Sequence, residues 1–300
     1  MKTIKRNLPL YLMLIPGLVA LLANNYLPMG GMLLAFKDYN YAKGFWGSDW
    51  VGFGNFEYLF GSDQAFVITR NTLLYNTTFI LISMTVALAL AIALAELRNQ
   101  KLAKVYQSIF FLPYFLSWVV VSYLVFSLLS VDMGALNNLL IGWGLEPINW
   151  YTEPVVWPFI LVAVNTWKWT GYDSIIFLAA IVSIDKSMYE AAAVDGATRW
   201  QQIRHITIPS IAPVISIVTL LKVGRIFYGD FGLFWNIPKN MGVLYNVTNV
   251  IDTYVYRALT QSGDIGMAAA SGLYQAVIGF SLVMISNYVV RRIDPDQALM

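Results

Sequence analysis

Residues 183–209 read SIDKSMYEAAAVDGATRWQQIRHITIP and separate two strongly apolar runs of the chain. Asp185 or Ser187 can accept hydrogen bonds from the first free backbone N–H groups of a helix that contains three consecutive alanines. Gly196 can adopt the left-handed conformation that commonly follows the last turn of a helix. The first half of the stretch therefore predicts a short helix with a capping residue at each end.

The second half of the stretch predicts another short helix. Thr198 can cap its start, and Pro209 is expected to end it because proline has no N–H to donate. With Glu190 beside consecutive alanines, the two helices would present a smooth, stiff surface that carries one negative charge. An ordinary amphipathic loop helix is the alternative interpretation of the same pattern.

The composition of the whole chain indicates a membrane protein. Hydrophobic residues make up 58% of the 300 residues and charged residues 12%, about half of the roughly 25% that is usual in soluble domains. A helix needs about 20 mostly apolar residues to cross a bilayer. Six runs qualify: residues 8–36, 73–94, 108–129, 155–181, 211–231 and 268–290. The sequence therefore predicts an all-α membrane protein with six transmembrane helices in a single domain over residues 1–300. Lys168 and Gly171 are expected to interrupt the fourth run.

Positive charges gather on one side of the six predicted spans. The tails and loops on the same side as residues 183–209 hold eleven Lys and Arg residues, and those on the opposite side hold five. Because the cytoplasmic side of a membrane protein is enriched in Lys and Arg, both termini and residues 183–209 are predicted to be cytoplasmic. The loop 37–70 is then external. Its Trp and Gly residues suit either a belt at the membrane surface or a docking site for another protein.

The residue inventory excludes several kinds of chemistry. The chain has no Cys, a single His and no Gly-x-x-x-x-Gly-Lys-Ser/Thr phosphate loop, so it offers no thiol catalysis, no His-rich metal centre and no ATP hydrolysis of its own. A net charge of +2 is too small to indicate a nucleic-acid partner. An ion-coupled secondary transporter is an alternative function. Asp173 is the one acidic residue in the middle of a predicted span that would serve it, but no internal repeat supports it.

Residues 190–209 resemble a motif of a known family. That motif runs Glu-Ala-Ala, three residues, Gly, nine residues, Ile, one residue, Leu, Pro. The chain has the same spacing with Glu190-Ala191-Ala192, Gly196, Ile206 and Ile208-Pro209. Only Ile208 departs from the motif, and it replaces Leu by a residue of similar size. The chain thus resembles the permease subunits of binding-protein-dependent ABC importers with the type I fold, with a core permease region over about residues 70–292.

The resemblance implies partners and a coupling site. In the family, the Glu-Ala-Ala helix lies against a separate ATPase in the cytoplasm and transmits its motion to the spans. This role would fall to Tyr189, Glu190, Ala191, Ala192, Asp195 and Gly196. Two ATPase subunits would bind ATP and Mg²⁺, so this chain would hold no cofactor. The location implied is the bacterial cytoplasmic membrane.

Four further segments resemble one branch of the sugar permeases. They are residues 9–17, 35–39, 229–234 and 251–257. That branch serves complex oligosaccharides and polysaccharide fragments. The resemblance implies that this chain forms half of the sugar path. A second permease of different sequence would form the other half, and an extracellular sugar-binding lipoprotein would deliver the sugar.

Polar and aromatic residues within the predicted spans are candidates for that path. Sugars need flat aromatic faces beside hydrogen-bonding groups, and charges inside a bilayer usually face a cavity or a partner. The candidates are Asn76, Trp118, Asn165, Trp167, Lys168, Trp169, Lys222, Arg225 and Tyr228. Lys222 and Arg225 are three residues apart, so they are expected on one helical face, where Asp230 or a partner's acid would neutralise them. Arg225 could also bind a sugar carboxylate. Packing for the aromatic residues, and reaching to the membrane surface for the cations, are the alternatives.

Overall fold

A computed structural model describes residues 7–293, which are helical apart from one two-stranded sheet. Contacts divide the described chain into two compact units. Unit 1 comprises residues 7–65 and 254–276, and unit 2 comprises residues 66–253 and 277–293. Helices α5 (Asp63–Ala95), α15 (Ile251–Thr260) and α16 (Ile265–Ile293) each have residues in both units. The single membrane domain over residues 1–300 stays a prediction.

Unit 1 opens with a long helical segment made of α2 (Leu8–Leu21), the π-helix η1 (Leu22–Tyr26) and the 3-10 helix η2 (Leu27–Phe36). Its residues Leu10–Phe36 are apolar enough to cross a bilayer, and none of the most apolar 18-residue window is buried. A helix that is apolar on every face needs lipid or another helix around it. Residues 8–36, the first predicted span, are thus helical throughout and expose an apolar surface.

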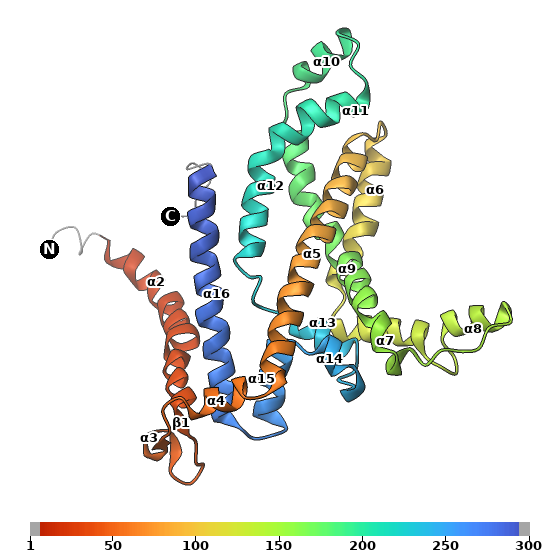
Figure 1. Cartoon of the computed structure of the whole chain (residues 1–300). Helices are drawn as coiled ribbons and strands as arrows, with labels where there is room; N and C mark the ends of the chain where they lie inside the picture. The colour runs from red at the N-terminus through yellow and green to blue at the C-terminus, as the bar shows by residue number, and fades with distance from the viewer. Residues whose placement is uncertain (1–6, 294–300) are drawn as a thin grey trace. The chain divides into compact units, whose positions relative to one another are not determined.

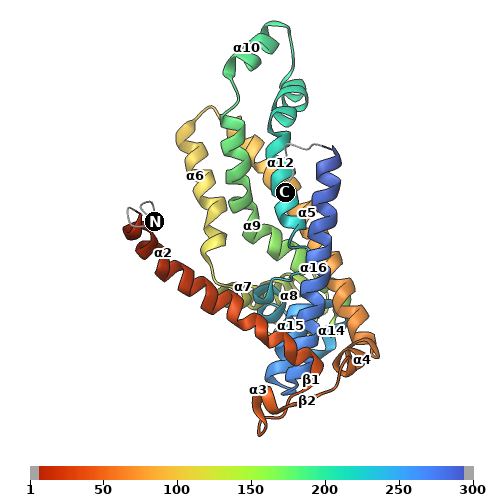
Figure 2. The same ribbon diagram turned by 90° about the vertical axis from the view of Figure 1, so that its left-hand side faces the viewer.

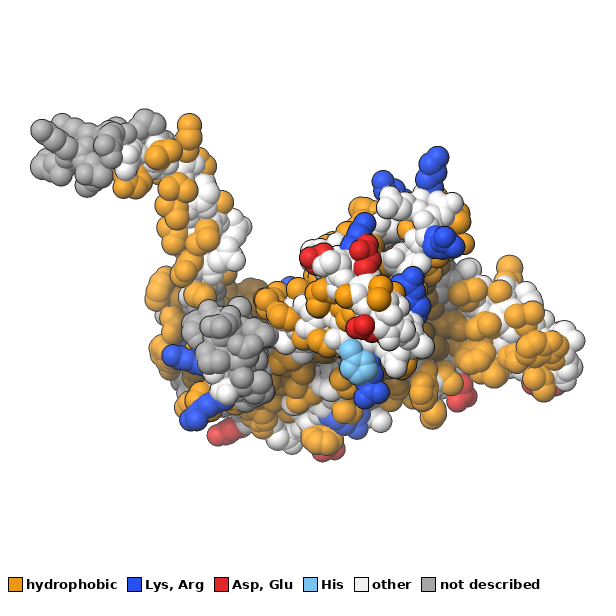
Figure 3. Space-filling view, turned by 90° about the horizontal axis from the view of Figure 1, so that it is seen from above, with side chains coloured by type: hydrophobic (Ala, Val, Ile, Leu, Met, Phe, Trp, Pro, Cys, Tyr) orange, Lys and Arg blue, Asp and Glu red, His pale blue; other side chains and the backbone are white. Residues whose placement is uncertain are grey.

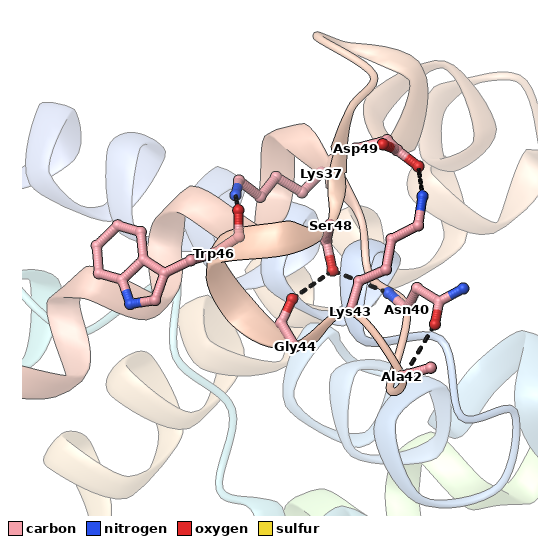
Figure 4. A network of polar contacts seen from close by, with 8 residues as sticks. All are labelled: Lys37, Asn40, Ala42, Lys43, Gly44, Trp46, Ser48 and Asp49. Atoms are coloured by element: carbon pink, nitrogen blue, oxygen red, sulfur yellow. Dashed lines mark hydrogen bonds and ion pairs between the residues drawn. The ribbon is translucent and has the colours of Figure 1, made fainter.

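A small hairpin follows this segment. Strands β1 (Lys37–Asp38) and β2 (Asp49–Trp50) pair antiparallel around α3 (Gly44–Gly47), and α4 (Gly54–Phe60) comes next. The buried Lys37 Nζ donates to the carbonyl oxygen of Phe45 at 3.0 Å and to that of Trp46 at 3.2 Å. Figure 4 shows the bond to Trp46. These bonds run from the first strand to the helix inside the hairpin, so the segment has a defined shape.

Unit 2 holds all or part of each helix from α5 onward. In chain order they are α5 (Asp63–Ala95), α6 (Gln100–Phe111), η3 (Leu112–Phe115), α7 (Trp118–Leu129), α8 (Ala135–Gly142), η4 (Trp150–Thr152), η5 (Pro154–Val156), α9 (Trp157–Val182), α10 (Lys186–Val194), α11 (Arg199–Gln202), η6 (Ile203–Thr207), α12 (Ile208–Val223), α13 (Phe231–Asn236), η7 (Gly242–Leu244), α14 (Tyr245–Thr248), α15 (Ile251–Thr260) and α16 (Ile265–Ile293). Helices α6 and α12 both pack along α9, and α10 and α11 lie together beyond one end of it (Figures 1 and 2).

Two apolar clusters hold α9 in place. Near its start, Trp157 and Leu161 pack with Leu233 and Phe234 of α13 and its surroundings. Towards its end, Phe177 belongs to a second cluster with residues of α5 and α12. Helix α9 therefore connects the two cores of unit 2.

Four described helices are long and apolar enough to cross a bilayer: Leu10–Phe36, Asp63–Ala95, Arg199–Val223 and Ile265–Tyr288. They correspond to the first, second, fifth and sixth predicted spans. Helix α9 corresponds to the fourth, and its 26 residues run without a break through Lys168 and Gly171, so the predicted interruption is wrong. Gly171 serves close packing instead, because a Cβ at this position would overlap the carbonyl group of Phe110 on α6. The count of six spans stays a prediction.

The predicted third span, residues 108–129, is not one straight helix. It is divided at a break where the chain bends by 99° between Gln100–Phe115 and Trp118–Leu129. Pro113 stands in η3 at the break, and Ser117 caps α7 by accepting from the Val120 N–H at 3.3 Å. A proline followed by a new N-cap starts a separate helix, which the apolar pattern alone did not reveal.

The predicted fifth span, residues 211–231, is shifted along the chain. Pro209 does not end the preceding helix: α11, η6 and α12 continue as one 25-residue helix, Arg199–Val223. The π-helical turn Ile203–Thr207 comes before Pro209, which takes one of the first positions of α12. A wide turn before the proline relieves the clash that an α-helix would have there. The helix then stops at Val223, so residues 224–231 lie outside it.

Candidate functional site

Helix α10 is capped at its start and carries a free charge. The Asp185 carboxylate accepts a hydrogen bond from the Ser187 N–H at 2.9 Å, which confirms one of the two predicted caps. This hydrogen bond to the charged form holds the pKa of Asp185 below its ordinary value. The Glu190 side chain is exposed and makes no hydrogen bond or ion pair with the rest of the described chain. Its carboxylate is therefore available to a partner.

The other end of α10 is closed by the turn at Gly196. Gly196 has a φ of +82°, in the left-handed region that was predicted. Its N–H donates to the Ala193 carbonyl at 3.1 Å, and the Ala197 N–H donates to the Ala192 carbonyl at 2.9 Å. This pair of bonds is the Schellman arrangement that satisfies the last carbonyl groups of a helix. The direction in which the chain leaves α10 is thus set by backbone bonds.

The second helix packs back on the first. Thr198 and Gln201 form a capping box, with the Thr198 N–H donating to Gln201 Oε1 at 2.7 Å. The hydroxyl groups of Tyr189 and Thr207 lie 2.9 Å apart and join α10 to η6. Because each helix is capped and the two are bonded together, residues 186–207 form one stiff helix–turn–helix at the end of unit 2.

The exposed surface of this helix–turn–helix carries small side chains and charged side chains. Ala191 and Asp195 are exposed, and a shallow cavity of about 400 Å³ lies between α10 and α11 beside Ala192. Acidic and basic side chains gather at this end of unit 2 (Figure 3). Arg199 of α11 pairs with Glu96 at 3.7 Å, just beyond the end of α5. This exposed pair adds little stability, but it places α11 next to a predicted span.

Lys168, a candidate for the sugar path, is enclosed by backbone carbonyl groups. Its Nζ donates to the carbonyl oxygens of Pro113 at 3.2 Å, Tyr114 at 3.1 Å and Leu116, and lies 5.0 Å from the centre of the Trp118 ring. An ammonium group has three protons to donate, and all three are used here. These hydrogen bonds fix the break between α6 and α7. Because Lys168 is only 5% exposed, its side chain does not face an open cavity.

The two other cations within the predicted spans have different surroundings. Lys222 pairs with Asp173 of α9 at 2.8 Å, and not with Asp230 as expected. Arg225 lies in the turn after α12 and is exposed, because the helix ends at Val223. The Arg225 N–H donates to the Lys222 carbonyl at 3.0 Å, so the two residues are one turn apart, and their common face stays a prediction. The Lys222–Asp173 pair also occupies the acidic residue on which the ion-coupled alternative depended.

Trp118 and Asp230 form part of the packing between α7 and α13. The Trp118 Nε1 donates to Asp230 Oδ2 at 3.0 Å, and Asp230 Oδ1 accepts from the Leu233 N–H at 3.3 Å as the cap of α13. A Cβ on Gly232 would overlap the Trp118 ring. The ring is thus wedged against backbone, which matches the packing alternative for this tryptophan.

Two other candidates, Asn76 and Asn165, link separate elements. Asn76 on α5 donates to the carbonyl oxygen of Tyr228 at 3.2 Å, which ties α5 to the turn after α12. The buried Asn165 on α9 donates to Ser83 Oγ on α5 at 3.4 Å. The Tyr228 side chain remains exposed.

Trp169 belongs to an aromatic cluster. The sequence predicted Trp169 as a candidate, but not the other members of the cluster. The rings of Tyr114 and Tyr172 stack 4.6 Å apart at 17°, and the Trp169 ring meets Tyr114 edge-on at 5.4 Å. Phe111 continues the stack 5.5 Å from Tyr114. Tyr172 is 38% exposed, so the stack has an open face. The aromatic run on both sides of Pro113 was the available signal for Tyr114.

Trp167 lies apart from that cluster. It lines a groove of about 940 Å³ between α5 and α9. The structure therefore does not bring all nine candidates together: Trp169 joins the aromatic cluster, Lys168 supports it, and Trp167 faces elsewhere.

Comparison with known proteins identifies the family. Residues 84–295 match a family described as the inner membrane component of binding-protein-dependent transport systems. The chain belongs to this family. It is an ABC transporter permease, a transport component and not an enzyme, as the Glu-Ala-Ala motif predicted. The ion-coupled alternative is therefore wrong.

Two curated proteins of Bacillus subtilis (strain 168) resemble the permease over nearly its full length. Protein LplB is 35% identical over 296 residues, which are 99% of this chain and 92% of LplB. The polygalacturonan/rhamnogalacturonan transport system permease protein YteP is 36% identical over 292 residues, 96% of this chain and 89% of YteP. The predicted likeness to permeases for complex sugars is confirmed.

A solved structure supports the fold of the permease. It is the crystal structure of a bacterial alginate ABC transporter in complex with an alginate pentasaccharide-bound periplasmic protein. One of its chains superimposes with a TM-score of 0.88 and 36% identity, and the match covers 97% of both chains. The all-helical, type I permease-like architecture predicted from the sequence is confirmed.

Proposed function

We propose that this permease forms one half of a path that carries an oligosaccharide or polysaccharide fragment across the bacterial cytoplasmic membrane. The substrates named for YteP and for the alginate transporter, all polymers of sugars, support this substrate class. A second permease of different sequence supplies the other half. An extracellular sugar-binding lipoprotein delivers the sugar, and two cytoplasmic ATPase subunits bind ATP and Mg²⁺.

In this proposal both termini and the helix–turn–helix of residues 186–207 are cytoplasmic, and the hairpin of unit 1 is external. The exposed aromatic residues of the hairpin, Tyr41 and Trp46 among them, then help to receive the binding protein. The distribution of Lys and Arg over the loops supports this orientation.

Coupling to the ATPase falls to α10. The observation that carries this step is a helix closed by caps at both ends whose single acidic side chain, Glu190, is exposed and unpaired in the described chain. ATP favours one arrangement of the ATPase subunits, and it can bias the spans only through an element that contacts both. Tyr189, Ala191, Ala192, Asp195 and Gly196 give that element its shape.

The aromatic cluster of Tyr114, Trp169 and Tyr172 provides the sugar platform in this proposal. Flat rings match the apolar faces of pyranose rings, and the phenol oxygens of Tyr114 and Tyr172 form no hydrogen bond with the described chain. Arg225 is exposed and able to bind a hydroxyl or a carboxylate of the sugar. Asn76, Asn165, Lys168 and Lys222 then shape the path by tying the helices around it together.

The test of the coupling step is Glu190→Lys. In this proposal the ATPase surface that receives the Glu190 carboxylate is positive. A lysine at position 190 would place two positive charges together, which costs several kcal/mol, so transport of labelled sugar is expected to fall by at least about a hundredfold. The complex of permeases should still insert in the membrane, because the Glu190 side chain is exposed and makes no hydrogen bond or ion pair within the described chain.

Lys104→Glu is the matched control, since it reverses an exposed charge in α6 on the same predicted side. It is expected to leave transport near normal. Wild-type transport rates in the Glu190→Lys variant would contradict the assignment of α10 as the coupling helix.

A further inference from the structure

A groove in unit 2 serves none of the steps above. It has a volume of about 940 Å³ and runs between α5 and α9, with α14 at one end and Phe110 at the other. Its α5 wall carries Leu74, Ile82 and Val86, and its α9 wall carries Phe159 and Val162. Leu74 is 60% exposed and Phe159 75% exposed, so nothing in the described part of unit 2 covers these apolar walls.

One end of the groove carries the positive charge of Arg70, whose side chain is fixed by hydrogen bonds. Arg70 Nη2 donates to the Asn246 carbonyl oxygen at 2.7 Å, and Arg70 Nε and Nη2 donate to Asn71 Oδ1 at 3.2 Å and 3.1 Å. These acceptors are neutral. No carboxylate in residues 7–293 pairs with the Arg70 guanidinium, and its Nη1 makes no hydrogen bond there.

The position of this charge along α5 is informative. Arg70 lies near the start of α5, three residues before Leu73, where the second predicted span (residues 73–94) begins. A helix rises about 1.5 Å per residue, so the backbone of Arg70 lies roughly 4–5 Å before the predicted span. That is the depth at which lipid headgroups border the hydrocarbon region.

We propose that this groove binds an anionic phospholipid. The phosphate of the lipid accepts hydrogen bonds from the Arg70 guanidinium, and an acyl chain lies along Leu74, Ile82 and Phe159. Arginine forms strong charge-assisted hydrogen bonds with phosphate, and the groove volume falls within the roughly 300–1,000 Å³ of ligand sites in general. A sugar fits less well, because it needs hydrogen-bonding groups along its whole length and the walls of the groove are mostly apolar.

Fluorescence quenching tests the proposal on the assembled transporter. The chain has no Cys, so Leu74→Cys gives one site in this subunit for a bimane probe inside the groove. The complex is reconstituted in bilayers of phosphatidylcholine with increasing amounts of bromine-labelled phosphatidylglycerol or bromine-labelled phosphatidylcholine. Signal from complex without Leu74→Cys is subtracted. Half-maximal quenching is expected at several-fold less brominated phosphatidylglycerol than brominated phosphatidylcholine.

Arg70→Gln separates the headgroup contact from simple access of lipid to the groove. It is expected to abolish the preference for phosphatidylglycerol, while Arg98→Gln, an exposed arginine just beyond the far end of α5, preserves it. A second variant, Ala163→Trp, fills the groove and is expected to reduce quenching by both lipids while the complex is still recovered intact.

Three results would overturn the proposal. They are equal quenching by the two lipids with Arg70 intact, no quenching by either lipid because another protein chain fills the groove, and relief of quenching by the transported sugar. If the wild-type complex prefers phosphatidylglycerol but transports no sugar, the result would instead count against the proposed function alone.

Discussion

Tyr172 is the residue at which the proposed sugar path can be tested most directly. Its ring stacks on Tyr114 and is 38% exposed. If sugars slide over this face, Tyr172→Leu removes an aromatic contact worth about 0.5–1.5 kcal/mol, and the KM for transport should rise roughly twofold to twelvefold. Tyr172→Phe keeps the ring and should transport nearly as well as the wild type.

Tyr123→Leu provides the comparison for that test. Its ring, on α7, is 69% exposed and lies outside the aromatic cluster, so its loss should leave the KM unchanged. Equal KM values for Tyr172→Leu and the wild type would remove the cluster from the path. Transport is measured in proteoliposomes that contain the full complex.

The three span cations show why part of the candidate site could not be predicted. Sequence alone places Lys168, Lys222 and Arg225 in apolar runs and gives all of them the same interpretation. The structure encloses Lys168 among carbonyl groups 52 to 55 residues away, pairs Lys222 with Asp173 across 49 residues, and leaves Arg225 exposed in a turn. The cost of a charge in an apolar run says that a partner is needed, but only the packing of α9 against its neighbours says which partner.

At the scale of elements, local chemistry was enough for the helix–turn–helix and too little for the spans beside it. The Asp185 cap, the Gly196 turn and the Thr198 capping box each depend on residues within five positions, and all three are present. The break after α6 and the passage of the helix through Pro209 depend on distant packing and on a π-helical turn. Hydrophobic runs therefore predicted that helices exist, and not where they bend.

Gly196 gives the element-scale prediction. With φ at +82°, a Cβ has open space but an unfavourable backbone, so Gly196→Ala should destabilise the end of α10 by about 1 kcal/mol. Asn tolerates this conformation better, so Gly196→Asn should cost less. Hydrogen exchange of the α10 amides in the assembled complex should rise in the order wild type, Asn, Ala, and sugar-stimulated ATPase activity should fall in the same order. Identical exchange in Gly196→Ala and the wild type would show that the turn does not hold the helix.

A pH dependence belongs to the same element. The pKa of Asp185 is lowered by the hydrogen bond from Ser187, so the carboxylate contributes its stabilisation of α10 at neutral pH and loses it as the pH falls through that lowered pKa. The cap should therefore persist throughout the range in which the transporter is assayed. Asp185→Ala should raise exchange of the first α10 amides at neutral pH, whereas Lys186→Ala should not.

At the scale of the whole molecule, the orientation of the chain follows from the uneven distribution of Lys and Arg, and it can be tested with single cysteines because the chain has none of its own. Ser48 is a poor site for such a label, since it is buried and its hydroxyl donates to the Gly44 carbonyl at 2.6 Å (Figure 4). Tyr41 is 73% exposed in the hairpin of unit 1, and Val194 is 88% exposed on α10.

The two sites should give opposite results with a membrane-impermeant maleimide. Tyr41→Cys is expected to react in intact cells, and Val194→Cys only after the membrane is opened, because the side with eleven Lys and Arg residues is retained in the cytoplasm. Binding protein loaded with sugar should slow the reaction at Tyr41→Cys if the hairpin receives it, and leave Val194→Cys unaffected. Reaction of Val194→Cys in intact cells would place α10 outside, where no ATPase could reach it, so this one result would refute the orientation and the coupling role together.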